Sequence, residues 1–400
     1  MQVAPGAIVD NLMKDFNIDA TKFGFLSACF YYAYTPLQLI SGLLLDRYSI
    51  KIILICATTI CSAGVLLFAC TSNFYIASLA RFIIGGTSAC SFISVLQLII
   101  RWIPPCYFAL FAGIVEMTGS FGGILGSKPF AVLLKYFDWH IVTMGFALFG
   151  FLLAILIAFV VQDQPKNLTP TSPTFNQNFI YNNLKIISYN RETWVIGIYS
   201  FFIWAPVISW ALWGASFLQS NCNLDHLTAT LAVAYAWLGI ALASPLIGLL
   251  SDLIARRCII MSTCAIIGLV VITILIFVTN MTSNLLNILT FLLGCASAGQ
   301  TLSFALIKDN NSSHTIGTAN GFNNMCVVAS GILFPILIGK ILDLNWQGMI
   351  QNNIKIYSIY GYRIAFMILP LCYFISSLIS IFGIKETYCL TNTKERCPRG

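Results

Sequence analysis

The chain has 400 residues, of which 58% are hydrophobic and only 9% are charged. This composition excludes an ordinary soluble domain, because a soluble fold of this size does not need so much apolar surface, and it is typical of a polytopic membrane protein. The formal net charge of +7 does not indicate nucleic-acid binding, since the basic residues form no patch with interleaved aromatic residues. We therefore expect the lipid bilayer, and no nucleic acid, as a partner.

A membrane-spanning helix needs about 20 apolar residues. In chain order the sequence offers eleven such stretches: Phe23–Leu45, Ile50–Cys70, Tyr75–Ile100, Phe108–Leu134, Ile141–Val161, Thr193–Leu218, Leu227–Leu250, Cys258–Val278, Leu285–Ile307, Ile316–Leu342 and Tyr362–Ile384. They predict an all-α membrane protein with about eleven transmembrane helices.

A long polar break, rich in Pro, Asn and Thr, separates the first five stretches from the last six. We predict four parts: an N-terminal helix bundle over 1–161, a cytoplasmic linker over 162–192, a C-terminal bundle over 193–384 and a cytoplasmic tail over 385–400. The sidedness follows from the Lys and Arg residues, most of which gather in the loops on one side, which the positive-inside rule makes cytoplasmic. We expect a monomer in a bacterial cytoplasmic membrane, with its C-terminus inside.

Two segments of the chain repeat each other about half a chain apart. Asp19–Lys51 and Asp225–Arg257 share a leading aspartate, a glycine (Gly42 and Gly248), a later aspartate (Asp46 and Asp252) and a terminal base, all at one constant offset. Duplicated helices are how many transporters place one substrate site between two halves. The repeat therefore predicts two bundles of helices with a substrate site between them, and a transport function.

If the halves are equivalent, the first one lacks a helix before Phe23, where only Met1–Lys22 remains. That segment is too short and too polar to span a membrane. Its apolar residues recur at helical spacing opposite its polar ones, which predicts an amphipathic surface helix. The apolar set is Val9, Leu12, Met13 and Phe16, and the polar set is Asp10, Asn11, Lys14 and Asp15.

Charged residues inside the bilayer are the best markers of a site, because burying a charge there costs several kcal/mol, roughly 2.5 to 3.5 on insertion scales. The clearest candidates are Arg81 and Glu116. We expect Arg81 to hold a substrate carboxylate, and Glu116 to hold an ammonium group or a transported proton. The alternative is a structural ion pair that locks two helices.

The first stretch carries a polar face, with side chains recurring every three or four residues. A polar stripe facing lipid is costly, so it faces a cavity or another helix. We assign Tyr31, Tyr34 and Gln38 of this face to the substrate site, with hydrogen bonding between helices as the alternative. A smaller polar patch near the inner end of a later stretch consists of Asn320, Asn323 and Asn324.

The two repeated aspartates each follow a spanning stretch, beside bases at the predicted cytoplasmic surface. A carboxylate there can accept hydrogen bonds from the free N–H groups at the start of another helix, where the helix dipole also favours negative charge. We predict that Asp46 meets the helix beginning near Ile316, and that Asp252 meets the one beginning near Phe108. The alternative role is loop solubility. The predicted gating set is Gly42, Asp46, Arg47, Gly248, Asp252 and Arg256.

Enzyme and metal motifs are missing from the sequence. The 14 cysteines are scattered and include no Cys-x-x-Cys pair, and there is neither a His-Glu-x-x-His motif nor a phosphate-binding Gly-x-x-x-x-Gly-Lys run. We therefore expect no enzyme activity, no metal, no cofactor and no ATP-driven transport.

One stretch resembles the signature between the second and third helices of the major facilitator superfamily: Gly42-Leu43-Leu44-Leu45-Asp46-Arg47-Tyr48-Ser49-Ile50-Lys51. Arg81 followed by Gly85 resembles the fourth-helix motif of that family. Several short motifs resemble a narrower branch, which includes the lysosomal dipeptide transporter and amino-acid carriers of intracellular bacteria: Tyr31-Tyr32-Ala33-Tyr34 with Gln38, Lys308-Asp309-Asn310 and Gly317-Thr318-Ala319-Asn320-Gly321-Phe322.

The resemblance implies a secondary carrier that moves an amino acid or dipeptide by alternating access, with a proton as a possible co-substrate of a symporter. Two departures stand against it. Ser49 replaces the usual glycine, and Pro5-Gly6 looks like the outer end of the family's first helix, so most of that helix is expected to be missing. The second hypothesis is accordingly a degenerate paralogue or membrane scaffold that keeps the fold without transporting.

Overall fold

The computed structural model describes residues 12, 14–16, 18, 20–125, 133, 136–163, 179–222, 224–279, 281–348, 350–351, 354–355 and 357–388. Helices dominate this part of the chain. Its two strands, β1 (Ile350–Gln351) and β2 (Ile354–Lys355), form one short antiparallel pair. The prediction of an all-α membrane protein is confirmed.

Every predicted apolar stretch coincides with a helix. The elements are α3 (Ala20–Arg47), α4 (Ile50–Cys70), α5 (Phe74–Trp102), η1 (Pro105–Tyr107), α6 (Phe108–Leu125), α8 (Trp139–Val160), α9 (Phe179–Tyr189), α10 (Arg191–Cys222), α11 (His226–Ile254), α12 (Arg257–Phe277), α13 (Ser283–Ser297), η2 (Ala298–Gln300), α14 (Thr301–Asn310), α15 (Ile316–Leu344), α16 (Ile359–Phe366), α17 (Ile368–Leu378) and η3 (Ile379–Gly383).

Within the described ranges, nine helical stretches are long and apolar enough to cross a membrane, the α13–α14 run and the α16–η3 run each counting as one. Helices α3 and α6 occupy the other two predicted stretches, with 28 and 18 residues. The rest of the predicted stretch Phe108–Leu134 lies mostly outside the described residues. Helix α9 was not predicted, because its sequence falls at the end of the polar linker.

The chain forms two compact units. Unit 1 comprises Met1–Pro105, Gly122–Tyr189 and Asn311–Met325, and unit 2 comprises Cys106–Phe121, Asn190–Asn310 and Cys326–Gly400. Each unit therefore takes the first turns of one helix from the other half of the sequence: α15 begins in unit 1, and α6 begins in unit 2.

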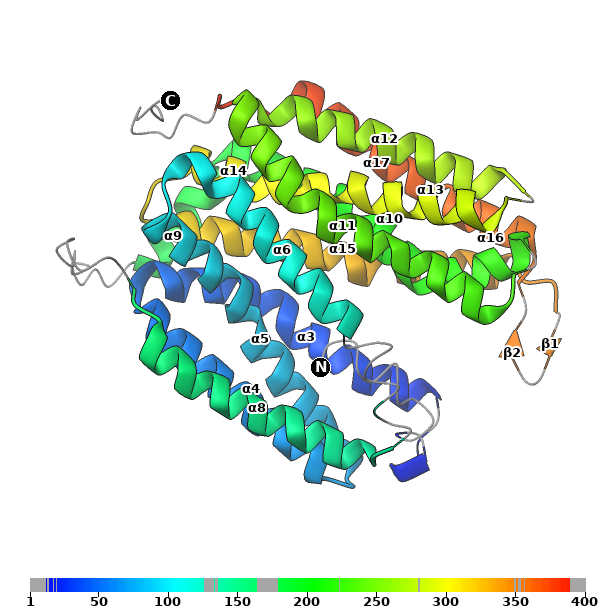
Figure 1. The fold of residues 1–400 in the computed structure, drawn as a ribbon, viewed down its shortest axis with the longest axis horizontal. Coiled ribbons are helices and arrows are strands. Elements are labelled where there is room, and N and C mark those ends of the chain that lie inside the picture. Colours follow the sequence, from blue (N-terminus) through cyan, green and yellow to red (C-terminus); the bar gives the residue numbers. More distant parts are fainter. Residues whose placement is uncertain are drawn as a thin grey trace. The chain divides into compact units, whose positions relative to one another are not determined.

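In unit 1, α5 packs against both α3 and α4, and α4 runs alongside α8 (Figure 1). The described residues near the N-terminus pack at one end of this group. Leu12 and Phe16 are buried in a cluster with Trp139, whereas Lys14 and Asp15 are exposed. The Trp139 indole N–H donates to the Asp15 carboxylate over 2.6 Å. The predicted amphipathic pattern is confirmed for these four residues, and the others named for it lie outside the described residues.

Several helices of both units begin at a polar side chain that accepts hydrogen bonds from the free first-turn N–H groups. Asn73 starts α5, Asp138 starts α8 and Asp225 starts α11 in this way. Asp138 lies in an exposed loop, and the N–H of His140 holds the pKa of its carboxyl below the usual value. These caps fix where the apolar helices begin.

In unit 2, α13 packs against α11 and α12, while α17 packs against α10 and α12. Large aromatic side chains fill the space between α10 and the C-terminal helices. The rings of Trp210 and Phe217 lie 6.1 and 5.0 Å from the ring of Phe366, and all three side chains are buried. This aromatic contact fixes α10 against α16.

Candidate functional site

Three of the predicted substrate residues meet at one aromatic ring in unit 1. The guanidinium carbon of Arg81 lies 5.2 Å from the centre of the Phe30 ring, and Arg81 is only 2% exposed. Tyr34 stacks on the same ring and Tyr31 meets it edge-on, each with centroids 5.2 Å apart. Phe30 was missed from the sequence, because a phenylalanine in an apolar helix carries no signal that separates it from ordinary core.

A close approach of α3 and α5 positions this cluster. A Cβ atom at Gly85 would lie 2.1 Å from the carbonyl oxygen of Phe30, so only glycine fits there. Arg81 stands one turn before Gly85 on α5, and its side chain is thereby placed over the Phe30 ring. A buried guanidinium among aromatic rings is well suited to bind a carboxylate in a bidentate manner.

Glu116, the other predicted charged residue, belongs to unit 2. Its role in binding an ammonium group or a transported proton stays a prediction, and so does the alternative of an ion pair with Arg81. Helix α6 comes very close to α11 one turn before Glu116: a Cβ at Gly113 would lie 2.3 Å from the carbonyl oxygen of Ser244. The small residue Gly113 thus admits a neighbouring helix close to Glu116.

Gln38 lies deep in unit 1, where α3 meets the first turns of α15. A Cβ at Gly321 would lie 2.4 Å from the carbonyl oxygen of Gln38. The Gln38 side chain is 0% exposed, and among the described residues neither its Nε2 nor its Oε1 has a hydrogen-bond partner. Asn320, beside Gly321, is also 0% exposed, and its Nδ2 and Oδ1 likewise have no hydrogen-bond partner among the described residues.

Asp46 binds the start of α15 within unit 1. Its Oδ1 accepts a hydrogen bond from the N–H of Gly317 over 2.7 Å, and its Oδ2 accepts one from the N–H of Thr318 over 2.8 Å and another from the Thr318 hydroxyl. Gly42, one turn earlier on α3, touches the backbone of Gly317: a Cβ at Gly42 would lie 2.2 Å from its carbonyl oxygen. We call the contact of Asp46 with Gly317 and Thr318 the Asp46 clasp.

Asp252 binds the start of α6 within unit 2. Its Oδ2 accepts a hydrogen bond from the N–H of Leu110 over 3.0 Å. A Cβ at Gly248 would lie 2.2 Å from the carbonyl oxygen of Ala109, which repeats the close approach seen at Gly42. Both helix-start contacts predicted for the repeated aspartates are confirmed, whereas their role in gating stays a prediction.

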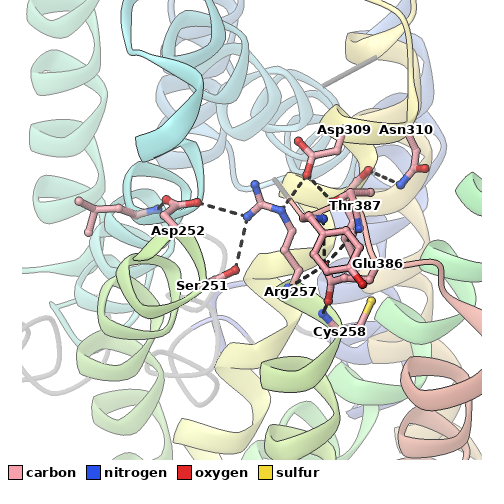
Figure 2. Close-up of polar contacts among 11 residues, drawn as sticks. Ser251, Asp252, Arg257, Cys258, Asp309, Asn310, Glu386 and Thr387 are labelled. Atoms are coloured by element: carbon pink, nitrogen blue, oxygen red, sulfur yellow. Dashed lines mark hydrogen bonds and ion pairs between the residues drawn. The ribbon is translucent and has the colours of Figure 1, made fainter. Parts of the chain in front are cut away.

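Asp252 also takes part in a buried ion network around Arg257, drawn in Figure 2. The Nε of Arg257 donates to Asp309 over 2.8 Å, and its Nη1 lies 3.3 Å from Asp252 and 3.5 Å from the Ser251 hydroxyl. Arg257 is 1% exposed. Arg256, the base named from the sequence for this end, is exposed, and its guanidinium lies 5.9 Å from the Tyr388 ring. The repeat itself held the signal for Arg257, because it aligns Arg257 with Lys51.

In each bundle, an acidic residue that follows the last helix caps the start of the helix that carries Lys51 or Arg257. Glu386 accepts hydrogen bonds from the N–H groups of Arg257 (3.0 Å) and Cys258 (2.8 Å) at the start of α12 (Figure 2). Asp163 accepts one from the N–H of Lys51 over 2.8 Å at the start of α4. Both bundles therefore carry such a cap, although Asp163 and Glu386 lie outside the repeated segments.

Comparison with known proteins places these features in a family. The family model described as Major Facilitator Superfamily matches residues 1–335 and 208–388. In Bacillus subtilis, the uncharacterized transporter YybO is 25% identical over 60% of this chain and 57% of its own length, so this chain spans little more than half of that relative. The hexuronate transporter of the same organism is 22% identical over 83% of this chain and 82% of its own length. The probable galactarate/D-glucarate transporter GudP is 21% identical over 84% and 80%.

Among solved structures, the fucose:proton symporter FucP of E. coli is similar in fold, with a TM-score of 0.70 over 96% of both chains at 14% sequence identity. That likeness agrees with the observed helices, and the family model extends over well above half of the sequence. With its repeated helix-end aspartates and its many apolar helices, the chain belongs to the Major Facilitator Superfamily and is a multi-pass membrane transporter.

Proposed function

We propose that this chain is a secondary carrier that moves a small organic anion of the sugar-acid type by alternating access in a bacterial cytoplasmic membrane. The observation that carries the proposal is Arg81, a guanidinium buried among aromatic side chains. The relatives support the class of solute. Their names refer to a hexuronate, to galactarate or D-glucarate and, for a 20% identical protein of Cupriavidus necator, to sulfoacetate, and each of these solutes carries an acidic group.

The physical argument rests on desolvation. Keeping a guanidinium out of water is costly, and that cost is offset when an anion with matching geometry binds. Hydrogen bonds between ionised partners are about twice as strong as neutral ones. A solute with a carboxylate therefore gains more from Arg81 than a neutral sugar does, and this difference gives the site its selectivity.

The other predicted residues supply the remaining polar contacts. Tyr31 and Tyr34, which share the Phe30 ring with Arg81, offer hydroxyl groups suited to a polyhydroxylated solute. Gln38, deeper along α3, offers an amide. Glu116 carries the transported proton or balances a positive charge.

The repeated aspartates act as gates in this proposal. One contact between a carboxylate and a helix start contributes only about 0.3–1 kcal/mol when exposed, and about 2 kcal/mol when partly buried. Since 1.4 kcal/mol changes an equilibrium tenfold, two such contacts are sufficient to shift a balanced pair of states. Release of the Asp46 clasp and of the Asp252–Leu110 contact accompanies the change of state, and Gly42 and Gly248 allow the close approach on which both contacts depend.

The narrower expectation of an amino-acid or dipeptide substrate is not supported by the relatives, whose names refer to sugar acids and a sulfonate. The same uptake assay decides between the classes. Proteoliposomes or cells are given labelled glucuronate and galactarate in parallel with labelled alanine and a labelled dipeptide. Uptake of the amino compounds without uptake of the acids would contradict the proposed class, and no uptake of any solute would favour the non-transporting alternative.

Arg81→Ala should abolish uptake of the acid while leaving membrane insertion intact, and Arg81→Lys should restore little, because an ammonium group cannot bind a carboxylate in a bidentate manner. The matched control is Arg191→Gln, since the Arg191 side chain is 67% exposed and pairs with its sequence neighbour Glu192. Full uptake by Arg81→Ala would remove Arg81 from the site. Full uptake by Glu116→Gln would rule out a protonation role for that carboxylate.

A further inference from the structure

The contact between α3 and the start of α15 is made largely by backbone. Gly42 touches Gly317, and Gly321 touches Gln38, with ideal Cβ positions 2.2 and 2.4 Å from the facing carbonyl oxygens. The residue numbers fall along α3 as they rise along α15, so the two helices run antiparallel through this contact. Both ends lie within unit 1, and the Asp46 clasp closes the contact at the end of α3.

One buried amide side chain belongs to α3 at this contact and another to α15 next to it: Gly321 touches the backbone of Gln38, and Asn320 directly precedes Gly321. Gln38 and Asn320 are each 0% exposed, and all four of their side-chain polar atoms are without a hydrogen-bond partner among the described residues. Among the described residues the Thr35 hydroxyl, one turn earlier on α3, also has no partner, whereas the next polar side chain after Gln38 on α3 has one. The Ser41 hydroxyl, one turn along α3, donates to the carbonyl of Leu37 over 2.6 Å.

An unmade hydrogen bond at a buried amide destabilises the state in which it is buried, because water satisfies the same group when it is exposed. The closed contact therefore contains two opposed contributions. The Asp46 clasp stabilises it, and the two buried amides destabilise it. A contact with only the first contribution would hold α3 and α15 together permanently.

We propose that Gln38 and Asn320 oppose the Asp46 clasp. Their buried amides raise the free energy of the closed contact between α3 and α15, so that the closed and open states stay near balance and the contact can open during transport. The proposal rests on the gating role given to Asp46 under the proposed function. It assigns Asn320 a role, and it gives Gln38 one that does not require contact with the solute.

The first turn of α15 provides a direct reporter. The N–H groups of Gly317 and Thr318 belong to the first helical turn, where intrahelical acceptors are missing, and they donate to Asp46 instead. Their hydrogen exchange therefore depends on the clasp. Exchange at these two amides, followed by mass spectrometry in lipid nanodiscs, measures how often the contact opens in the full chain, with no need for a solute.

The variants are Gln38→Met and Asn320→Leu, which keep side-chain volume and remove the polar atoms. Each should slow exchange at Gly317 and Thr318 by about tenfold or more, because the penalty of an unmade buried hydrogen bond is of the size of one decade. Asp46→Asn should speed the same exchange. Ser41→Ala is the matched control, since its hydroxyl is already satisfied by its own helix, and it should leave the exchange unchanged.

Unchanged or faster exchange in both Gln38→Met and Asn320→Leu would overturn the proposal, because it would mean that the amides do not destabilise the closed contact. Lost uptake in Gln38→Met with unchanged exchange would overturn it for Gln38 and leave that residue as a solute contact. A failure of the proposed function looks different. If no solute is taken up but exchange slows in the two variants, the opposing role of the two amides is supported and only the proposed transport function is contradicted.

Discussion

Asp46 and Asp252 stand at the same position of the internal repeat, yet the two units hold them by different chemistry. Asp46 in unit 1 accepts three hydrogen bonds from two residues at the start of α15. Asp252 in unit 2 accepts one from Leu110 and forms an ion pair with the buried Arg257. Duplication has thus kept the place of the carboxylate and its helix-start target, while the surrounding charges have diverged.

The difference has an energetic meaning. A carboxylate on helix N–H groups can leave for water at modest cost, because the N–H groups also find water. A guanidinium held between two carboxylates in a buried site cannot lose one partner without leaving charge uncompensated. The contact in unit 1 is therefore suited to open repeatedly, and the network in unit 2 is suited to keep α12 and α14 together.

The largest effect should come from Arg257→Leu. Removing this guanidinium leaves Asp309 and Asp252 buried without their partner, which should destabilise the protein by about 3–5 kcal/mol. Unfolding in detergent, followed by thermal or denaturant titration, measures the loss. Arg256→Leu is the control, since Arg256 is exposed, and it should change stability by less than about 0.5 kcal/mol. Equal losses in the two variants would show that the network does not stabilise unit 2.

Asp46→Asn should have the next largest effect. It should change how often the contact between α3 and α15 opens more than it changes the free energy of unfolding. The amide replaces one acceptor by a donor that faces the N–H groups of α15, and each hydrogen bond to a charged group contributes about 1.5–3 kcal/mol. Hydrogen exchange at Gly317 and Thr318 reports the opening, because their N–H groups donate to Asp46. Exchange at these two amides should be at least about tenfold faster.

The matched control for Asp46→Asn is Asp138→Asn, which alters another helix-capping aspartate of unit 1 that faces solvent. Exchange at Gly317 and Thr318 should not change in this control. An unchanged rate in Asp46→Asn as well, together with normal transport, would remove the clasp from the mechanism and erase the contrast between the two units.

Smaller and equal effects are expected from Gly42→Ala and Gly248→Ala. Each added methyl would lie 2.2 Å from a facing carbonyl oxygen, so the helices must separate, at a cost of about 1–3 kcal/mol. Gly119→Ala is the control, because nothing lies within 4 Å of its Cβ position, and alanine should there stabilise the helix slightly. A clear difference between the first two variants would mean that the repeat has diverged in its packing as well as in its charges.

The smallest effects should come from the caps. Glu386 accepts two N–H groups at the start of α12 and Asp163 accepts one at the start of α4, so Glu386→Gln should cost more than Asp163→Asn, both within about 0.5–2 kcal/mol. Hydrogen exchange at the first turns of α12 and α4 measures each loss locally. Equal exchange in both variants and the parent would show that the caps are incidental.

Much of this arrangement could be predicted from local sequence. The helices follow apolar stretches of membrane-spanning length, and the contacts of Asp46 and Asp252 follow from the repeat together with the free N–H groups at helix starts. Arg257 and Asp309 could not be paired in advance, because they lie 52 residues apart and meet only through the packing of α12 and α14. Phe30 and α9 were missed for the same reason: tertiary contacts decide what a ring or a short amphipathic segment does.

The glycine contacts between α3 and α15 have one more consequence. Where backbone meets backbone, as at Gly42 with Gly317, closing the contact freezes no side-chain rotamers at those points, so little side-chain entropy is lost each time the helices meet. Opening likewise requires no interlocked side chains to slide past one another. A surface of this kind can part and rejoin in the same register over many cycles, and the register is set by the glycines themselves.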